Sequence, residues 1–370
     1  MQKDYIEILK ECINTKQLAI VKGSYIDEFE TQAAELFGNK YGVSTCNGTS
    51  ALYLSLFCTS RTRPEKSEVI VPAYGFHGTV SAICAYGLKP VFCDVDPETF
   101  AIDFDKCEQL INENTLAVMV LQPWGNIADL DKMSKLKNKY SNVYFISDSS
   151  HAHGATWNDK LIGSYFDINC ASFGMGKLVS GGELGALTTD NIEFRELGVI
   201  FSHTNRVPKD LLTEKYKEID NAVGIKFRPH LFGLLLGLED LKTYKSRKEV
   251  LDANIYDLQN FLLKNSEIKF VTEYSKTKRS FWKLVFILPD STDIESLIAN
   301  LASDNISAEK HNYRVILPEN SIFTKFYGIK VTNSYPNANK IVKQNILQIP
   351  FQFLTDKGNI EKLKIALSKI

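Results

Sequence analysis

The chain has 370 residues, of which 44% are hydrophobic and 24% are charged, and its formal net charge at neutral pH is −1. This length is too great for one small core and suits two lobes of unequal size, because domains typically contain roughly 100–200 residues. The balanced charge leaves no electrostatic footprint for nucleic acid or for an anionic membrane, so neither is expected as a partner. Any anionic ligand must therefore be held by local groups.

The cysteines, histidines and N-terminus bear on compartment and metal binding. Seven cysteines occur without a CxxC pair, which predicts reduced thiols in a reducing compartment. The N-terminal segment is charged throughout, and the longest apolar stretch, residues 231–238, is far shorter than the ~20 residues of a membrane helix. We therefore expect a cytoplasmic protein. His151 and His153 form an HxH pair without a matching cysteine or carboxylate cluster, so no metal site is expected.

Apolar, β-branched runs alternate with helical patterns between about residues 43 and 190. The runs predict strands at 43–46, 68–72, 90–95, 116–122, 143–148, 168–173 and 184–189. Helical patterns lie between them at 50–58, 79–86, 103–111 and 129–140. Several strands are apolar throughout, which is typical of strands covered on both faces. The alternation predicts an α/β fold with a mostly parallel, seven-stranded sheet.

The remainder of the chain predicts a second, smaller domain. A long helix over 229–264 is expected to connect the two lobes. Further strands are expected at 268–272, 281–287 and 346–349, and an amphipathic helix at 359–370. We expect residues 1–240 to form the large domain with its N-terminal segment, and residues 241–370 to form a small α+β C-terminal domain.

The loops that follow the predicted strands are the expected ligand site, because ligands of open α/β sheets bind at the carboxyl ends of strands. In NGTSAL (47–52), Thr49 and Ser50 begin a helix, where free N–H groups and the helix dipole favour a phosphate. A plain helix N-cap explains these residues equally well. In PAYGFHGT (72–79), Phe76 is a candidate to stack on a flat ring, although a loop aromatic is more often part of the core.

Two charged residues in the later loops stand out. Asp148 ends the apolar run VYFI, where a carboxylate is costly without a charged partner such as a protonated ring nitrogen, although a lone Asp commonly caps a turn. His151 follows closely enough to orient that carboxylate or to cover the ring. Lys177 lies five residues after Ser172 in a glycine-rich loop. Most lysines are solvated, but one partly withdrawn from water has a depressed pKa and acts as nucleophile and base.

Two nucleotide-binding motifs are excluded at the same positions. The segment GMGKL is not a P-loop, because Leu178 follows the lysine in place of Ser or Thr. No GxGxxG follows the first predicted strand, so a dinucleotide-binding fold has no support.

The order of six motifs along the chain resembles that of the DegT/DnrJ/StrS sugar aminotransferases. These motifs are GTSAL, VPAYGF, GLKPVFCDVDPETF, QPWGNIADLD, SDSSHAHGA and SF followed by a lysine. The likeness runs from about residue 23 to the C-terminus. It implies fold type I architecture, pyridoxal 5'-phosphate (PLP) as cofactor with pyridoxamine phosphate as its aminated form, and a homodimer with shared active sites. The implied reaction moves an amino group, typically from glutamate, to the keto-hexose of a nucleotide-sugar, for amino-sugar and lipopolysaccharide or O-antigen biosynthesis.

The resemblance also implies roles for individual residues. Lys177 and Asp148 match the catalytic pair, the lysine that is joined to the cofactor and the carboxylate that pairs with its pyridine nitrogen. His151 matches a position that contacts the cofactor, and Phe76 matches the aromatic that stacks on its ring. The complete implied cofactor-binding set is Thr49, Ser50, Phe76, Asp148, His151, Ser172, Lys177 and Lys226.

The phosphate and substrate contacts complete the expected site. Within the implied set, Thr49, Ser50 and Ser172 match the phosphate cradle, whereas Lys226, with Arg228, matches a loop that reaches the phosphate in the neighbouring subunit. From its residues alone, the segment KHNYRVIL (310–317) is a candidate sugar site, and a strand edge explains it equally well. The candidate substrate residues are His311, Tyr313 and Arg314.

Two other functions are weighed against the aminotransferase. The first is a nucleotide-sugar dehydratase of the same family, in which the resemblance places His where this chain has Lys177. The second is a cofactor-binding homologue without catalysis. The lysine argues against the first, and the combination of Lys177, Asp148 and Ser172 argues against the second. The departures QPWG (122–125), GGELG (181–185) and Lys226 from the usual family wording leave the particular sugar open.

Overall fold

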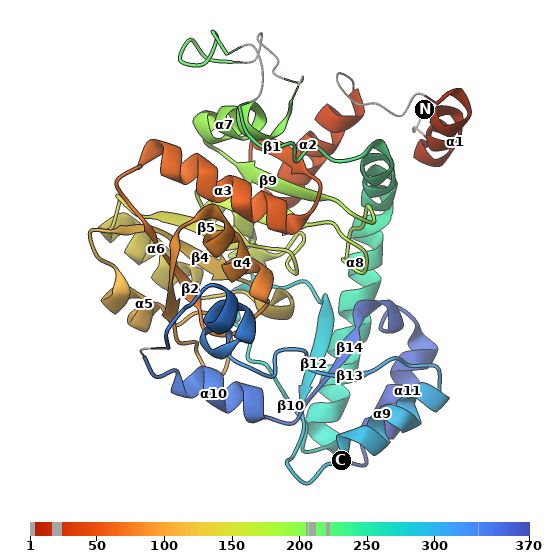
Figure 1. The fold of residues 1–370 in the computed structure, drawn as a ribbon. Coiled ribbons are helices and arrows are strands. Elements are labelled where there is room, and N and C mark those ends of the chain that lie inside the picture. The colour runs from red at the N-terminus through yellow and green to blue at the C-terminus, as the bar shows by residue number, and fades with distance from the viewer. Residues whose placement is uncertain (1–3, 17–23, 205, 207–211, 220–222, 332) are drawn as a thin grey trace.

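The computed structural model describes residues 4–16, 24–204, 206, 212–219, 223–331 and 333–370. A large α/β body is joined to a smaller body at the C-terminal end by one long helix, α8 (Leu231–Asn265) (Figure 1). Among the described residues, no helix combines the length and the apolar character needed to cross a bilayer. All seven cysteines are free thiols, as expected.

The large sheet contains seven strands in the order β1-β9-β8-β5-β4-β2-β3. Their bounds are β1 (Tyr41–Thr45), β2 (Glu68–Pro72), β3 (Lys89–Cys93), β4 (Thr115–Leu121), β5 (Tyr144–Asp148), β8 (Ile168–Ser172) and β9 (Gly185–Thr189). Strand β9 runs antiparallel to both of its neighbours, β1 and β8, and the other adjacent pairs are parallel. Each strand overlaps a predicted one, so the mostly parallel, seven-stranded sheet is confirmed.

Helices cover both faces of this sheet, as the apolar strands predict. Strand β4 is buried along its whole length, and its alternate side chains enter two different cores. Ala117 and Met119 join the core beneath α3 (Gly48–Thr62), α4 (His77–Tyr86) and α7 (Ile192–Ser202). Val118 and Val120 join the opposite core, beneath α5 (Phe104–Leu110) and α6 (Leu130–Lys139). Helix α2 (Ser24–Phe37) packs against β1 and β9.

The strand directions decide where a ligand site can form. Six strands, all except β9, point the same way, so their carboxyl ends meet at one edge of the sheet. Strand β5 ends there at Asp148, and β8 ends there at Ser172. The chain leaves β1 and β2 at the same edge to begin α3 and α4. The motifs singled out in the sequence therefore share one edge.

The C-terminal part has the predicted α+β composition. Its antiparallel sheet has the order β10-β12-β14-β13, with bounds β10 (Lys269–Phe270), β12 (Lys283–Ile287), β14 (Ile346–Pro350) and β13 (Glu309–Lys310). Leu284, Phe286, Leu347 and Ile349 point into a core shared with α8, α9 (Ile294–Ser303) and α11 (Lys357–Leu367). The opposite face of the sheet, which carries Val285, is directed towards the large sheet and its core.

The structure also differs from the sequence predictions. The long helix begins at Leu231 and not at residue 229, because His230 is its N-cap and accepts a hydrogen bond from the Phe232 N–H. Helices α1 (Tyr5–Thr15) and α10 (Pro336–Lys343) were not predicted. Nor was a small sheet, β11-β6-β7, which joins β11 (Thr277–Lys278) to β6 (Thr156–Trp157) and β7 (Lys160–Leu161). The predicted domain boundary at residue 240 falls inside α8 and stays a prediction.

Candidate active site

Lys177 lies in the turn that follows β8, at the carboxyl edge of the sheet. The turn is closed by backbone hydrogen bonds, from the Lys177 N–H to the Gly174 carbonyl at 3.1 Å and from the Gly181 N–H to the Phe173 carbonyl at 2.8 Å. Burial lowers the pKa of the Lys177 ammonium to about 8, against the opposing effect of the Asp148 carboxylate. A lysine in this state is a usable base near neutral pH. The expected withdrawal of this amine from water is present.

Asp148 is almost fully buried at the end of β5 and is held by two donors. The Thr79 hydroxyl donates to its Oδ2 at 2.8 Å, and the Ser150 N–H donates to its Oδ1 at 3.2 Å. Hydrogen bonds of this kind satisfy a buried carboxylate and fix its orientation. Thr79, in the first turn of α4, was missed in the sequence. Its position three residues after Phe76, in the same loop motif, was the available signal.

The start of α3 and Ser172 form a common corner. Asn47 is the N-cap of α3 and accepts from the Ser50 N–H at 2.8 Å, so Thr49 and Ser50 are not the cap. A Cβ added at Gly48 would lie 2.7 Å from the Ser172 Cβ, which shows how closely the two segments approach. This corner combines a helix N-terminus with the hydroxyls of Thr49, Ser50 and Ser172, which is a donor set suited to a phosphate.

Phe76 and His151 lie in different environments. Phe76, just before α4, is 43% exposed and is therefore not a core residue. His151 is buried, and its Nδ1 accepts a hydrogen bond from the Trp124 N–H at 3.3 Å. Burial, followed by the charges of Lys177 and Lys283, holds the pKa of His151 well below its usual range. The imidazole is therefore neutral, with its proton on Nε2.

His153 has a structural role. Its Nδ1 accepts from the Val179 N–H at 3.2 Å, so its Nε2–H donates to the Ser172 carbonyl at 2.9 Å. Burial, followed by the charge of Lys177, lowers the pKa of His153 to about 3. Among the described residues, no group of three His, Cys, Asp or Glu side chains is placed to hold a metal. The neutral His153 instead ties the end of β8 to the lysine turn.

Trp282 and Lys283, at the start of β12, form a wall of the site that the sequence predictions missed. The Trp282 ring stacks on His151 with a centroid distance of 3.8 Å and an interplanar angle of 10°. Lys177 Nζ lies 4.2 Å from the centre of the same ring, and the Trp282 indole N–H donates to the Gly176 carbonyl at 2.8 Å. A lysine within the otherwise apolar predicted strand 281–287 was the available signal for this wall.

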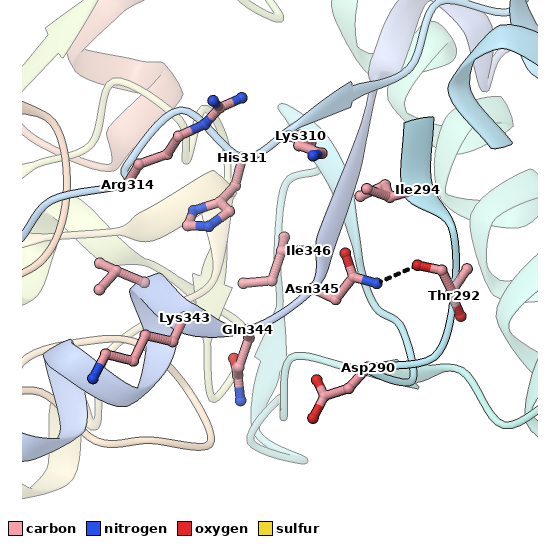
Figure 2. Close-up of a pocket in the computed structure, with 11 residues that line it drawn as sticks. Asp290, Thr292, Ile294, Lys310, His311, Arg314, Lys343, Gln344, Asn345 and Ile346 are labelled. Atoms are coloured by element: carbon pink, nitrogen blue, oxygen red, sulfur yellow. Dashed lines mark hydrogen bonds between the residues drawn. The ribbon is translucent and has the colours of Figure 1, made fainter. Parts of the chain in front are cut away.

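The predicted sugar-binding residues lie around Tyr74 and beside α10. The Tyr313 ring lies 5.6 Å from those of Tyr74 and Trp124, and burial, followed by the Asp148 charge, raises its pKa. His311 Nδ1 lies 3.4 Å from the Tyr74 hydroxyl, and His311 and Arg314 also line a pocket of about 430 Å³ beside α10 (Figure 2). Figure 2 shows the His311 ring directed towards α10 and the Arg314 side chain directed away from it.

Lys226 and Arg228 lie on a segment that runs beside Cys46, the residue directly before the N-cap of α3. Their segment is fixed to the large domain by a hydrogen bond from the Cys46 N–H to the Phe227 carbonyl at 2.6 Å. Arg228 donates to the Thr204 carbonyl at 2.6 Å, and the Lys226 side chain is exposed. The structure thus brings together Thr49, Ser50, Phe76, Asp148, His151, Ser172 and Lys177, whereas a contact of Lys226 with a neighbouring subunit stays a prediction.

The fold is that of the fold type I PLP-dependent transferases, as expected from the sequence. The solved structure of the E. coli GDP-4-keto-6-deoxy-D-mannose-3-dehydratase with bound hydrated PLP superposes with a TM-score of 0.83 at 22% identity, covering 99% of this chain and 97% of that one. The sequence model of the DegT/DnrJ/EryC1/StrS aminotransferase family matches residues 1–365, so the chain belongs to this family.

Two curated relatives cover most of the chain. The GDP-perosamine synthase of Vibrio cholerae is 25% identical over 334 residues, which are 88% of this chain and 87% of the relative. The GDP-4-keto-6-deoxy-D-mannose 3-dehydratase of Escherichia coli O55:H7 is 27% identical over 344 residues, again 88% of this chain and 87% of the relative. The family therefore contains both reactions that the sequence analysis weighed.

Proposed function

We propose that the chain is a PLP-dependent aminotransferase that moves an amino group from L-glutamate to the keto-hexose of a nucleotide-sugar. One arrangement carries the proposal: Lys177, whose pKa is lowered to about 8, interacts electrostatically with the buried Asp148 carboxylate, and the start of α3 closely approaches Ser172. Membership of the aminotransferase family and the resemblance to GDP-perosamine synthase support it. We further propose that the amino sugar serves surface-polysaccharide synthesis, such as lipopolysaccharide O-antigen.

The residues of the site fit this cofactor. Thr49, Ser50 and Ser172 would hold its phosphate at the start of α3, where the absence of a side chain at Gly48 keeps the corner open. Asp148 would pair with the pyridine nitrogen. When bound, PLP supplies an electron sink that stabilises negative charge on the reacting carbon.

Phe76 and His151 would contact the cofactor ring. The exposure of Phe76 leaves its face available for stacking. The neutral His151, held by the Trp124 N–H, supplies a flat partner that adds no competing positive charge. We place these two side chains against the ring and Asp148 at its edge.

The chain's own groups then account for the proton transfers. Lys177 would be the covalent attachment point and, once released, the base that removes a proton from the donor carbon and returns it to the cofactor carbon. Its lowered pKa gives it a larger unprotonated fraction at neutral pH than a solvated lysine has. Thr79 and Ser150 would keep the Asp148 carboxylate in place through both half-reactions.

The same site argues against a dehydratase. A lysine at position 177 provides both the attachment point and the base for exchange of the amino group with a donor. The expected reaction therefore consumes glutamate and forms 2-oxoglutarate, whereas a dehydratase would deoxygenate the sugar and release ammonia.

A second copy of the chain would complete the site. Val223 and Ile225, on the segment that carries Lys226, expose 67% and 48% of their surfaces. We propose that this segment contacts the partner in a homodimer and that Lys226 reaches the partner's phosphate corner. We assign the dimer to the cytoplasm, in keeping with its free thiols.

The test is an assay of purified enzyme with PLP, L-glutamate and GDP-4-keto-6-deoxy-D-mannose. We expect the visible absorbance of the bound cofactor to change on addition of glutamate, and an aminated sugar to appear with one 2-oxoglutarate per turnover. Release of ammonia with a deoxygenated sugar would identify a dehydratase. An unchanged cofactor spectrum with glutamate would identify a protein that binds PLP without transamination.

A further inference from the structure

One face of the small sheet carries a row of polar side chains. Gln348 in β14 is paired with Val285 in β12 and with Glu309 in β13, so these three share a face. Lys283, two residues before Val285, points to that face as well. The Trp124 indole N–H donates to Gln348 Oε1 at 3.0 Å, so the row is directed towards the Lys177 region of the large domain.

Lys283 lies close to the proposed reacting centre. Its Nζ is 4.8 Å from the centre of the Trp282 ring, and Lys177 Nζ is 4.2 Å from the same centre. After burial and the charge of Asp148, the charge of Lys283 is the remaining influence on the pKa of Lys177, and it acts to lower it. The two amines therefore lie against the same indole ring.

The ion pair between Lys283 and Glu309 could be replaced by a pair between Lys283 and an anionic ligand. Lys283 is 6% exposed and forms an ion pair with Glu309, whose side chain is 40% exposed. A buried cation requires an anionic partner, whereas a carboxylate at the edge of the site can turn into solvent at little cost. In the proposed function, Lys177 and Asp148 are both committed to the cofactor, so Lys283 is the cation left beside the reacting atoms.

We propose that Lys283 binds a carboxylate of the dicarboxylic amino donor, which displaces Glu309 from the ion pair. This inference rests on the proposed function and adds a specificity-determining residue to it. The exchange of one carboxylate for another keeps Lys283 paired throughout, so no uncompensated charge is buried. When the donor leaves as 2-oxoglutarate, Glu309 returns, and the site is free for an uncharged keto-sugar ring.

The experiment compares Lys283→Met and Lys283→Arg holoenzymes with the unaltered enzyme. The rate of the cofactor absorbance change is followed against L-glutamate concentration, and GDP is titrated as a competitor of GDP-4-keto-6-deoxy-D-mannose. Lys283→Met should raise the half-saturating glutamate concentration about tenfold to a hundredfold, the range for a lost charge-assisted hydrogen bond. The inhibition constant of GDP should change by less than about threefold, since GDP binding does not depend on the lost pair. Lys283→Arg should restore most of the glutamate affinity.

Two further variants keep the test decisive. Glu309→Gln removes the competing carboxylate and should tighten glutamate binding. This variant tests the inference even if Lys283→Met fails to fold. Lys278→Met, at a 74% exposed lysine paired with Asp159, is the matched control and should alter neither ligand. The inference would be overturned, and the proposed function left intact, by either of two results in Lys283→Met. The first is an unchanged half-saturating glutamate concentration. The second is a loss of affinity for GDP that equals the loss for glutamate or occurs without it. A lack of transamination by the unaltered enzyme would instead overturn the proposed function itself.

Discussion

The close approach of Gly48 to Ser172 makes a sharp prediction for cofactor affinity. In Gly48→Ala, the new Cβ would lie 2.7 Å from the Ser172 Cβ, 3.0 Å from its Cα and 3.1 Å from its N. Two of these atoms belong to the backbone, so a change of rotamer cannot relieve the contact. The start of α3 and the end of β8 must move apart, and this movement opens the proposed phosphate corner.

The size of the effect follows from the cost of overpacking. Inserting a methyl group into a well-packed site costs about 1–3 kcal/mol, and about 1.4 kcal/mol corresponds to a tenfold change in a dissociation constant. If the displacement falls on the phosphate corner, the Kd for PLP should rise about fivefold to a hundredfold. Pyridoxal, which lacks the phosphate, should lose much less affinity.

The assay is a titration of apoprotein with PLP and with pyridoxal, followed by absorbance. Gly358→Ala is the matched control, because its Cβ would meet the side-chain Oδ1 of Asp356 at 3.0 Å, in the first turn of α11 and outside the site. That control should leave both affinities unchanged. Equal losses for PLP and pyridoxal in Gly48→Ala, or no loss for either, would refute the assignment of this corner to the phosphate.

Three further predictions test other parts of the site and fold. Thr79→Val removes the 2.8 Å hydrogen bond to Asp148 and should lower the apoprotein's free energy of unfolding by about 1.5–3 kcal/mol in urea; an unchanged value would contradict the proposed support of this carboxylate. The pKa of Lys177 is about 8 in the folded protein and 10.5 in the unfolded chain, so between these values the unfolded chain binds more protons and the free energy of unfolding rises with pH. Lys177→Met should lose this rise. An equal pH dependence of stability in both proteins would contradict the lowered pKa. Asp94→Ala removes the acceptor of the Ala338 N–H at 2.9 Å, at the start of α10, and should lower the melting temperature by several degrees, with retained stability as the contrary result.

Much of the fold could be predicted because the strands of a covered parallel sheet leave a clear pattern. The run of β4, which is apolar from Leu116 to Leu121, and the turn-rich segments around it indicate the strand's place and type. Asp148 and Lys177 could be singled out for a related reason: each polar group interrupts or directly follows an apolar strand, where burial makes an unpartnered charge costly. The short strand β13, with two residues, has too little periodicity to be recognised.

The rest of the site depends on contacts between distant segments. Trp282 and Lys283 are more than a hundred residues from Lys177 in the sequence, and the register of β12 against β14 decides which side chains face the large domain. In the sequence, Thr79 has the features of any residue in the first turn of a helix, and only the structure shows its hydrogen bond to Asp148 at the end of β5. The contact of His311 with Tyr74 likewise could not be predicted, because the two residues are 237 positions apart in the sequence.

The central claim is that one lysine amine at the end of β8 is the attachment point for PLP. The most direct measurement is borohydride reduction of the holoenzyme, followed by proteolysis and mass spectrometry of the labelled peptide. We expect one stoichiometric label, on Lys177, and its loss in Lys177→Ala. A label on Lys283 or on any other side chain, or no label on a protein that binds PLP, would contradict it.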